Sequence, residues 1–372
     1  MKILTLTYHF AINYGAILQC YALQKALNDL KYDSQVLNYI NFNQKKNNSL
    51  YKQNKGVKRL IKNILYFPYH KEREHKYLLF KMFLENNITL TKEITNISSL
   101  EKFLNQGSGI IFVGSDQVWN PNIDDFSESF FVPIKTNYYK ATYGASIGSA
   151  DSSQLDKYGR EIASFDKISV RENKSINILK KYTSKNISIV PDPVFLINKN
   201  EWISLIKNNQ REHKNKYILC YFLNNKNMRS YYKIVRKIAS KMNLKIICIS
   251  GGISPLYYKK NTIRNAGPIE FLDLFYNANY VFTDSFHGTV FSIIFEKQFF
   301  SFDSSSAIKD SRKKGILERC SLLDRYVTLD NLSTLDNYKK MINYSLISPK
   351  IEKIKIEGLN FIENTIKETK NL

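Results

Sequence analysis

The feature that most constrains the fold is a regular alternation between short apolar segments and segments with helical periodicity. Apolar runs occur at residues 2–8, 110–114, 141–146, 168–172 and 187–193. Short apolar runs that lead into Gly, Ser, Asp or Arg are typical of parallel strands buried on both faces. Between the first two runs, one helical face collects apolar residues, namely Leu18, Ala22, Leu23, Ala26, Leu27 and Leu30. The pattern predicts an α/β fold with parallel sheets.

The same alternation begins again in the second half of the chain. Strand-like runs occur at residues 217–223, 245–252, 280–285 and 298–303, with helical segments between them. A charged connector precedes this second series. No internal sequence repeat relates the two series.

The chain length also favours two domains, because 372 residues exceed a usual single domain. We predict a doubly wound Rossmann-like domain over residues 1–200 and a second one over residues 201–347, which face each other across a cleft. Ligands of such folds bind at the carboxyl ends of the strands. Residues 348–372 are predicted to form a terminal helix that can pack back on the first domain.

A basic helical insertion near residues 45–85 interrupts the first series. Residues 57–82 mix Lys, Arg and His with Tyr, Phe and Leu at helical spacing, and Pro68 breaks the pattern. We favour an amphipathic helical hairpin with a solvated basic face. The alternative is a segment that lies on a membrane surface or binds an acidic partner.

The net charge of +22 admits three interpretations. A nucleic-acid partner, an anionic substrate or membrane, and a Lys-rich composition without a partner all fit it. Because the lysines are spread along the whole chain, charge alone does not choose, and no nucleic-acid partner is predicted. The amino terminus is typical of a strand and not of a signal peptide. The four scattered cysteines predict buried free thiols and a reducing, cytoplasmic compartment.

Two loops that follow predicted strands of the first domain carry candidate ligand contacts. In the first loop, Gly15 permits close backbone approach of an anion to a helix start, next to Asn13. In "VGSDQVWNP", Ser115 and Asp116 offer hydrogen bonds to hydroxyl groups, and Trp119 could stack on a sugar. Alternatively, Asp116 caps a helix and Trp119 belongs to the core.

Two further loops complete the set in the first domain. "GASIGS" contains Ser146 and is apt for phosphate or sugar, but equally for a tight turn. Arg171 ends the predicted strand "ISVRE". A cation at this position is costly unless it pairs with Glu172 or with a bound anion.

"TDSFHG" in the second domain places His287 on the turn between a strand and a helix. A positive helix start disfavours the imidazolium, whereas Asp284 or a bound phosphate favours it. Such opposed influences can hold a proton donor near neutrality. The alternative is a structural histidine at a helix cap. No second His or Cys lies at ligand spacing, so no metal site is predicted.

Six segments together resemble the polysaccharide pyruvyl transferase family, in the order in which that family has them. The segments are "NYGAILQCYALQKAL", "FVGSDQVWNP", "YGASIGS", "ISVRENKS", "VPDPVFL" and "TDSFHG", followed by "SRKKGILERC". The resemblance implies a GT-B-like architecture. It also implies a transferase that moves a pyruvyl group from phosphoenolpyruvate to two hydroxyls of a glycan or lipid-linked sugar, forming a cyclic ketal. Such an enzyme would work in the cytoplasm or at the inner face of the cell membrane, in the biosynthesis of a cell-surface polysaccharide.

The resemblance also implies roles for individual residues. His287 matches the catalytic histidine of the family, and Arg171 matches an arginine that contacts the carboxylate or phosphate of the donor. Many members have Arg-Leu-His where this chain has Ser285, Phe286 and His287, so one cation is missing. Arg312, or the lysine after it, could replace that cation. Phosphoenolpyruvate is then a donor substrate, and no cofactor is implied.

The main alternative is a GT-B-type glycosyltransferase that uses a nucleotide-sugar donor. Such an enzyme often has a glutamate near the end of a strand in its second domain, and Glu270 is the candidate here. A glycan- or nucleic-acid-binding protein without catalysis is the third possibility. Arg171 and His287 argue against it.

Overall fold

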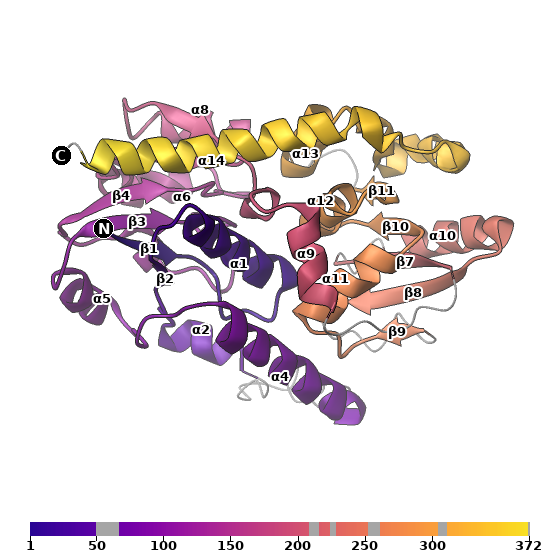
Figure 1. Cartoon of the computed structure of the whole chain (residues 1–372), viewed down its shortest axis with the longest axis horizontal. Coiled ribbons are helices and arrows are strands. Elements are labelled where there is room, and N and C mark those ends of the chain that lie inside the picture. Colours follow the sequence, from indigo (N-terminus) through magenta and orange to yellow (C-terminus); the bar gives the residue numbers. More distant parts are fainter. Residues whose placement is uncertain (50–66, 208–215, 224–227, 252–260, 304–310, 371–372) are drawn as a thin grey trace. The chain divides into compact units, whose positions relative to one another are not determined.

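The structure is a computed structural model that describes residues 1–49, 67–207, 216–223, 228–251, 261–303 and 311–370 (Figure 1). The chain divides into two compact units. The first unit comprises Met1–Gln53, Leu84–Ile197 and Lys353–Leu372, and the second comprises Asn54–Phe83 and Asn198–Glu352.

The first unit is built on a four-stranded parallel sheet in the order β2-β1-β3-β4. The strands are β1 (Lys2–Leu6), β2 (Ser34–Val36), β3 (Gly109–Val113) and β4 (Tyr138–Thr142). A parallel pair, β5 (Ile168–Val170) and β6 (Ile187–Ile189), extends this arrangement through single bridges from Ala141 and Ala145.

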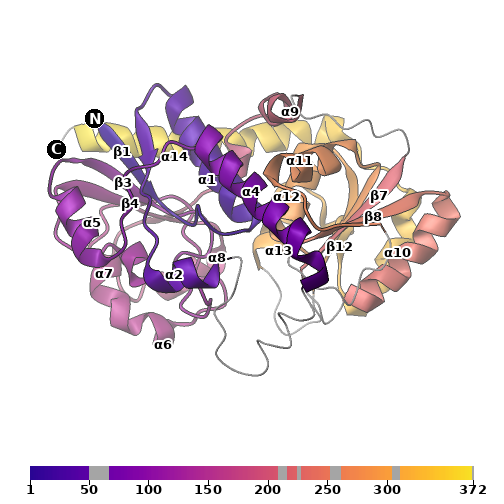
Figure 2. The same cartoon turned by 90° about the horizontal axis from the view of Figure 1, so that it is seen from below.

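Successive residues of β1 and β3 supply two separate cores, as expected for strands buried on both faces. Ile3, Ile110 and Phe112 pack with α1 (Tyr14–Asp29) and α14 (Ser348–Lys370) on one face. Their neighbours Leu4, Leu6, Ile111 and Val113 pack on the other face, which α5 (Ile97–Leu104), α6 (Ser152–Leu155) and α7 (Gly159–Ala163) cover. Figure 2 shows these helices on opposite sides of the strands. The smaller α2 (Phe42–Asn47) and α8 (Asn173–Leu179) complete the unit.

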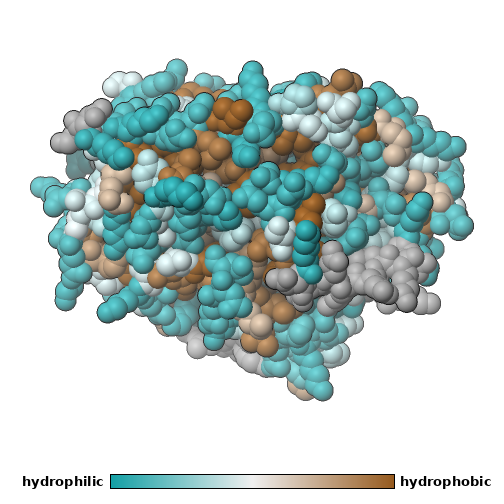
Figure 3. Space-filling view, in the orientation of Figure 1, coloured by the Kyte–Doolittle hydropathy of each residue, from teal (hydrophilic) through white to brown (hydrophobic). Residues whose placement is uncertain are grey.

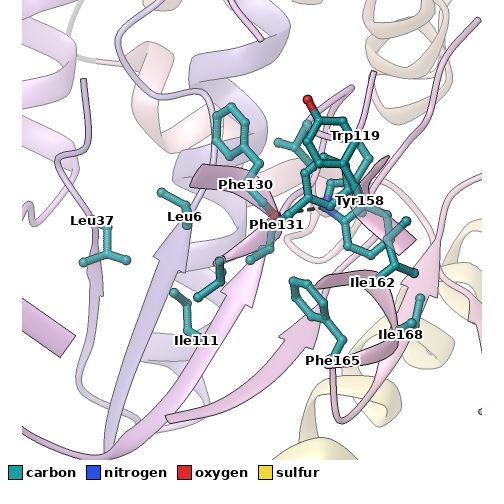
Figure 4. Packing of buried hydrophobic residues seen from close by; sticks show 14 of the residues in the cluster. Leu6, Leu37, Ile111, Trp119, Phe130, Phe131, Tyr158, Ile162, Phe165 and Ile168 are labelled. Atoms are coloured by element: carbon teal, nitrogen blue, oxygen red, sulfur yellow. Dashed lines mark hydrogen bonds between the residues drawn. The ribbon is translucent and has the colours of Figure 1, made fainter. Parts of the chain in front are cut away.

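Aromatic side chains fill the second of these cores (Figure 4). The Trp119 ring stacks on Phe131 at 5.4 Å between ring centroids, and Phe131 in turn stacks on Tyr158 at 4.2 Å. Trp119 Nε1 donates a hydrogen bond to the Phe130 carbonyl at 2.9 Å, which satisfies its polar atom inside the core.

The predicted terminal helix is α14, and from Lys353 onward it belongs to the first unit. Phe361, Ile362 and Ile366 join the core of the α1 face, and Lys167 Nζ lies 2.6 Å from a carboxylate oxygen of Glu368. Gly358 permits the close approach, because a Cβ there would lie 2.6 Å from Leu196. On the face drawn in Figure 3, hydrophilic side chains cover most of the surface and hydrophobic ones are scattered among them.

The second unit contains a six-stranded parallel sheet in the order β12-β11-β10-β7-β8-β9. The strands are β7 (Tyr217–Phe222), β8 (Lys245–Ser250), β9 (Thr262–Ile263), β10 (Tyr280–Thr283), β11 (Gln298–Phe302) and β12 (Tyr326–Val327). The helices are α9 (Lys199–Lys207), α10 (Met228–Met242), α11 (Pro268–Asn277), α12 (Phe286–Ile294) and α13 (Ser311–Arg319). The predicted α/β class with parallel sheets is therefore confirmed.

The described part of the basic insertion is a short 3-10 turn at Phe67–Tyr69 followed by α4 (His70–Asn87). Pro68 lies in the turn, where the predicted hairpin bends, and residues 57–66 lie outside the described residues. Within the described ranges, no helix has both the length and the apolar character needed to cross a bilayer.

The four cysteines, Cys20, Cys220, Cys248 and Cys320, are buried free thiols, as predicted. Burial raises the pKa of Cys320 to about 12. These thiols therefore have the character of core side chains and not of reactive nucleophiles.

Lys76 of α4 is a buried cation of the second unit, with 4% of its surface exposed. Its Nζ donates to the carbonyl of Ser250 at 3.0 Å, at the carboxyl end of β8, and burial lowers its pKa to about 7. The ordinary pKa of lysine, which applies in the unfolded chain, is near 10.5. Between pH 7 and this value the unfolded chain therefore binds more protons than the folded chain, and the free-energy cost of burying the Lys76 charge falls as the pH rises.

We expect Lys76→Met to stabilise the protein more at pH 6 than at pH 10, because only at the lower pH does the native lysine keep its charge in an apolar site. Thermal unfolding of the variant and of wild type at both pH values measures the difference. Lys71→Met, on the exposed side of the same helix, is the control. A pH-independent effect of Lys76→Met would contradict the expectation.

Candidate functional site

The carboxyl ends of β3 to β6 bring four of the predicted site residues of the first unit together. Val170 of β5 pairs with Ile189 of β6, so Arg171 and Asp192 leave the sheet at the same edge. The backbone N–H of Ser146 donates to the Asp116 carbonyl at 3.0 Å, which joins the loops after β3 and β4. Ser115 Oγ donates to the carbonyl of Gly144 at 3.3 Å in the same place.

Arg171 is held between two carboxylates. Its Nη1 donates to Asp192, and its Nη2 donates to Asp116 Oδ1 at 3.3 Å. The Arg171 side chain is 2% exposed and that of Asp192 is 0% exposed, so this ion pair is fully inside the protein. The pairing with Asp192, and not with Glu172, compensates the buried charge of the guanidinium. The sequence signal was an aspartate in "VPDP", directly after the strand that neighbours β5.

Glu172 forms a separate buried cluster with serines. Its Oε1 accepts from Ser146 Oγ at 2.8 Å and from Ser175 Oγ at 2.7 Å. The Ser146 hydroxyl therefore binds the Glu172 carboxylate inside the protein and does not face a ligand from an open loop. Arg171, Asp116, Asp192 and Glu172 carry formal charges of +1, −1, −1 and −1, a sum of −2. A region with this charge suits hydroxyl groups better than it suits a multiply charged anion.

Asp116 is the member of this cluster that keeps access to solvent, with 15% of its side chain exposed. It has a φ of 71°, a left-handed conformation that aspartate tolerates better than most residues. Its Oδ1 also accepts from the backbone N–H of Gln117 at 2.9 Å. The alternative prediction that Asp116 caps a helix is wrong, because a turn and not a helix follows it.

Trp119 lies in the core, as the alternative prediction had it. Its ring is fully buried among Phe131 and Phe165, so it offers no surface on which a sugar could stack. Asn13 and Gly15 also have a structural position. Asn13 caps α1, and its side-chain oxygen accepts a hydrogen bond from the N–H of Gly15 at 3.0 Å. This N–H, which was predicted to bind an anion, therefore already has an acceptor within the protein.

In the second unit, Ser285 and His287 lie at the start of α12. Ser285 is the N-cap and its Oγ accepts from the backbone N–H of Gly288 at 3.2 Å. The Thr283 hydroxyl accepts from the N–H of Ser285 at 3.1 Å and donates to the Tyr221 carbonyl at 2.6 Å. A Cβ on Gly288 would lie 2.3 Å from the Thr283 hydroxyl, so glycine is required there. These contacts fix the turn that presents the imidazole.

His287 is buried, with 9% of the residue exposed, and its Nε2 is inaccessible to solvent. Its ring meets the edge of the Phe286 ring at 5.2 Å between centroids. Asp284, predicted to favour the imidazolium, accepts from the backbone N–H of Leu223 at 2.6 Å. That carboxylate therefore links the ends of β7 and β10.

The two cations suggested as replacements for the missing arginine have different surroundings. Lys313 is buried, and its Nζ donates to the carbonyls of Phe302 at 2.7 Å and Asp284 at 3.0 Å and lies 3.4 Å from Asp303. Lys313 therefore links the carboxyl ends of β10 and β11, and its ammonium group is not available to a ligand. The Arg312 guanidinium instead lies 5.4 Å from the centre of the Phe286 ring, so Arg312 lies next to the turn that carries His287. Sequence reasoning missed the structural role of Lys313, because nothing local indicates which of two adjacent cations points inward.

Within the ranges that the structure describes, no group of three or more His, Cys, Asp or Glu side chains could hold a metal ion.

Solved structures with a similar arrangement define the class of fold. MnaA of S. aureus, solved with UDP, matches with a TM-score of 0.55 and 12% identity, over 100% of this chain and 97% of that one. The UDP-GlcNAc 2-epimerase of Neisseria meningitidis, bound to UDP-GlcNAc, has a TM-score of 0.52 and 11% identity, over 99% and 100% of the two chains. The UDP-GlcNAc 2-epimerase of Methanocaldococcus jannaschii, with UDP-GlcNAc and UDP, has a TM-score of 0.51 and 15% identity, over 92% of each chain. At this identity the similarity shows the fold alone, which is the GT-B fold.

The sequence decides the family within that fold class. The pattern described as polysaccharide pyruvyl transferase matches residues 13–306. The chain therefore belongs to the polysaccharide pyruvyl transferase family, as its six segments indicated. No curated protein matches the chain significantly.

We expect Arg171→Met to destabilise the first unit by about 3–5 kcal/mol, because it removes the cation that neutralises the buried Asp192. Urea denaturation measures this loss. The double variant Arg171→Met/Asp192→Leu should recover part of it, since no buried charge then remains at Asp192.

Lys181→Met is the matched control, because it breaks an ion pair with Asp156 in which both side chains are about half exposed. Its expected cost is below about 1 kcal/mol. Equal losses from Arg171→Met and Lys181→Met would show that the buried pair does not have the importance assigned to it.

Proposed function

We propose that the protein transfers the pyruvyl group of phosphoenolpyruvate to two hydroxyls of a glycan or lipid-linked sugar, forming a cyclic ketal. Membership of the polysaccharide pyruvyl transferase family supports the reaction type. The observation that carries the proposal is that a proton-transfer group, His287, and a cation, Arg312 of α13, both lie beside Phe286. His287 follows Phe286 in the chain, and Arg312 lies against the Phe286 ring.

The donor chemistry requires both groups. A proton added to the methylene carbon of phosphoenolpyruvate makes its C2 an oxocarbenium-like electrophile, which one sugar hydroxyl attacks. The C2–phosphate bond then breaks, and the second hydroxyl attacks C2 to close the ketal. Of the two hydroxyl protons released, one balances the proton taken up by the methylene carbon and one leaves with phosphate. In this proposal His287 transfers these protons, and Arg312 neutralises the anionic donor.

The carboxylate-rich cluster of the first unit supports a second part of the proposal. Asp116 keeps access to solvent and can accept hydrogen bonds from the hydroxyls of the acceptor sugar. Arg171, which the resemblance assigns to the donor, has two carboxylate partners, so we assign it the positioning of Asp116. The proposal keeps Ser285 as the cap that fixes the His287 turn, and it leaves Trp119 out of the acceptor site.

Transfer from a nucleotide-sugar donor remains the main alternative. Its candidate residue, Glu270, accepts the backbone N–H of Gly267 at 3.0 Å and caps α11, which gives it a structural task. The assay that separates the two reactions supplies phosphoenolpyruvate or UDP-sugars with a panel of lipid-linked glycans. Release of phosphate with formation of a ketal supports the proposal, and release of UDP with glycosyl transfer would replace it.

We expect His287→Ala to abolish phosphate release in this assay while the free energy of unfolding changes by less than about 2 kcal/mol. The turn should keep its shape, because hydrogen bonds of the Ser285 and Thr283 hydroxyls hold it. Steady-state kinetics and urea denaturation give the two readouts. Full activity of the variant would remove His287 from the reaction.

Arg312→Gln should raise the KM for phosphoenolpyruvate at least tenfold, with a smaller effect on kcat, because a charge-assisted contact to the donor is lost. Lys314→Gln is the control, since it removes a cation two residues away that is half exposed and near Glu318. If both variants leave the KM for the donor unchanged, Arg312 does not bind the donor.

A further inference from the structure

Helix α10 of the second unit presents an exposed face that consists of cations and serines. From Arg229 onward, where the burial of each residue is described, every exposed residue belongs to one of these two types, namely Arg229, Ser230, Lys233, Arg236, Lys237, Ser240 and Lys241. The opposite face is apolar, and Tyr231, Val235, Ile238 and Ala239 pack in the core beside β7 and β8. Because the core fixes the rotation of the helix, the five cations are held on the outer side, and Figure 1 shows α10 there.

The helix itself supplies no negative side chain to compensate these cations. It contains no Asp or Glu. Arg229 and Lys233, Lys233 and Lys237, and Lys237 and Lys241 are four residues apart, a spacing at which like charges destabilise a helix. Among the described residues, no ion pair involves Lys233, Arg236, Lys237 or Lys241. Helices α13 and α14, in contrast, each contain an ion pair between a lysine and a glutamate of the same helix, namely Lys314 with Glu318 and Lys367 with Glu363.

The cations also line a shallow, open hollow in the surface. It has a volume of about 510 Å³ and is lined by Lys233, Arg236, Lys237, Ser240 and Lys241. The lining offers hydrogen-bond donors and positive charge, and it includes no acidic or aromatic side chain. Such a lining fits an anionic headgroup bearing a phosphate.

We propose that the basic face of α10, the seven exposed residues named above, binds the surface of an anionic lipid bilayer. The row of cations from Arg229 to Lys241 spans about 18 Å along one straight helix, which suits a flat charged surface. Its exposed positions lack large apolar residues, so the contact is electrostatic, reversible and weakened by salt. They also lack the aromatic platforms on which single-stranded nucleic acids stack, which favours lipid over nucleic acid. This surface includes none of residues 57–82, and the proposal does not depend on the proposed reaction.

The test is flotation of the full-length protein with vesicles of phosphatidylcholine alone or mixed with phosphatidylglycerol. We expect wild type to bind only the mixed vesicles and to dissociate as salt is raised. The variant Lys233→Gln/Arg236→Gln/Lys237→Gln/Lys241→Gln should bind them at least tenfold more weakly. Circular dichroism and thermal unfolding confirm that the variant is folded, because these four side chains lie outside the core.

A matched variant removes four lysines from α14, where glutamates accompany them, by substituting Gln for Lys353, Lys355, Lys367 and Lys370. It changes the net charge by the same amount and should keep most of the binding. Equal losses in the two variants would overturn the proposal, because total charge would then be the cause. Failure of wild type to bind the mixed vesicles would also overturn it. Displacement from the vesicles by a single-stranded oligonucleotide, with tighter binding to it through the same four residues, would overturn it in favour of nucleic acid.

Discussion

The arrangement of this protein follows from the burial of its parallel strands on both faces. A strand that packs against helices on each side has few exposed positions along its length, so its charged side chains tend to lie where the strand ends. In the first unit this holds for Asp116, Ser146, Arg171 and Asp192, which all follow strands at the same edge of the sheet. The turn with His287 follows the same rule in the second unit.

The charged residues of the candidate site are arranged differently in the two units. In the first, one guanidinium is enclosed by carboxylates, and the excess charge is negative. In the second, Arg312 lies near the imidazole turn, while Lys313 and Asp303 neutralise each other inside. A reaction that joins neutral hydroxyls to an anionic donor needs one region of each kind. The proposed roles assign the hydroxyls to the first and the anion to the second.

Much of this fold could be predicted from the sequence, because continuous apolar runs and helical periodicity are local signals. The strands beginning at Lys2, Gly109 and Tyr280 were each indicated by such a run. The site was less accessible. Trp119 and Asn120 stand in a loop by sequence, and only the surrounding aromatic residues, which lie up to 46 positions further along, place Trp119 in a core. The sequence also did not indicate that Asp192 is the partner of Arg171. The pairing of β5 with β6 brings the two residues together, although they are not close in the sequence.

The position of α14 has a consequence for how the chain is made. Phe361, Ile362 and Ile366 complete the core on the α1 face of the first sheet, yet the ribosome synthesises them after the whole of Asn198–Glu352. Until then, Tyr143, Val190 and Leu196 on the nascent first unit lack the helix that covers them. The amino-terminal half therefore emerges with an apolar surface open to aggregation, and a chaperone that shields it during translation would favour correct folding.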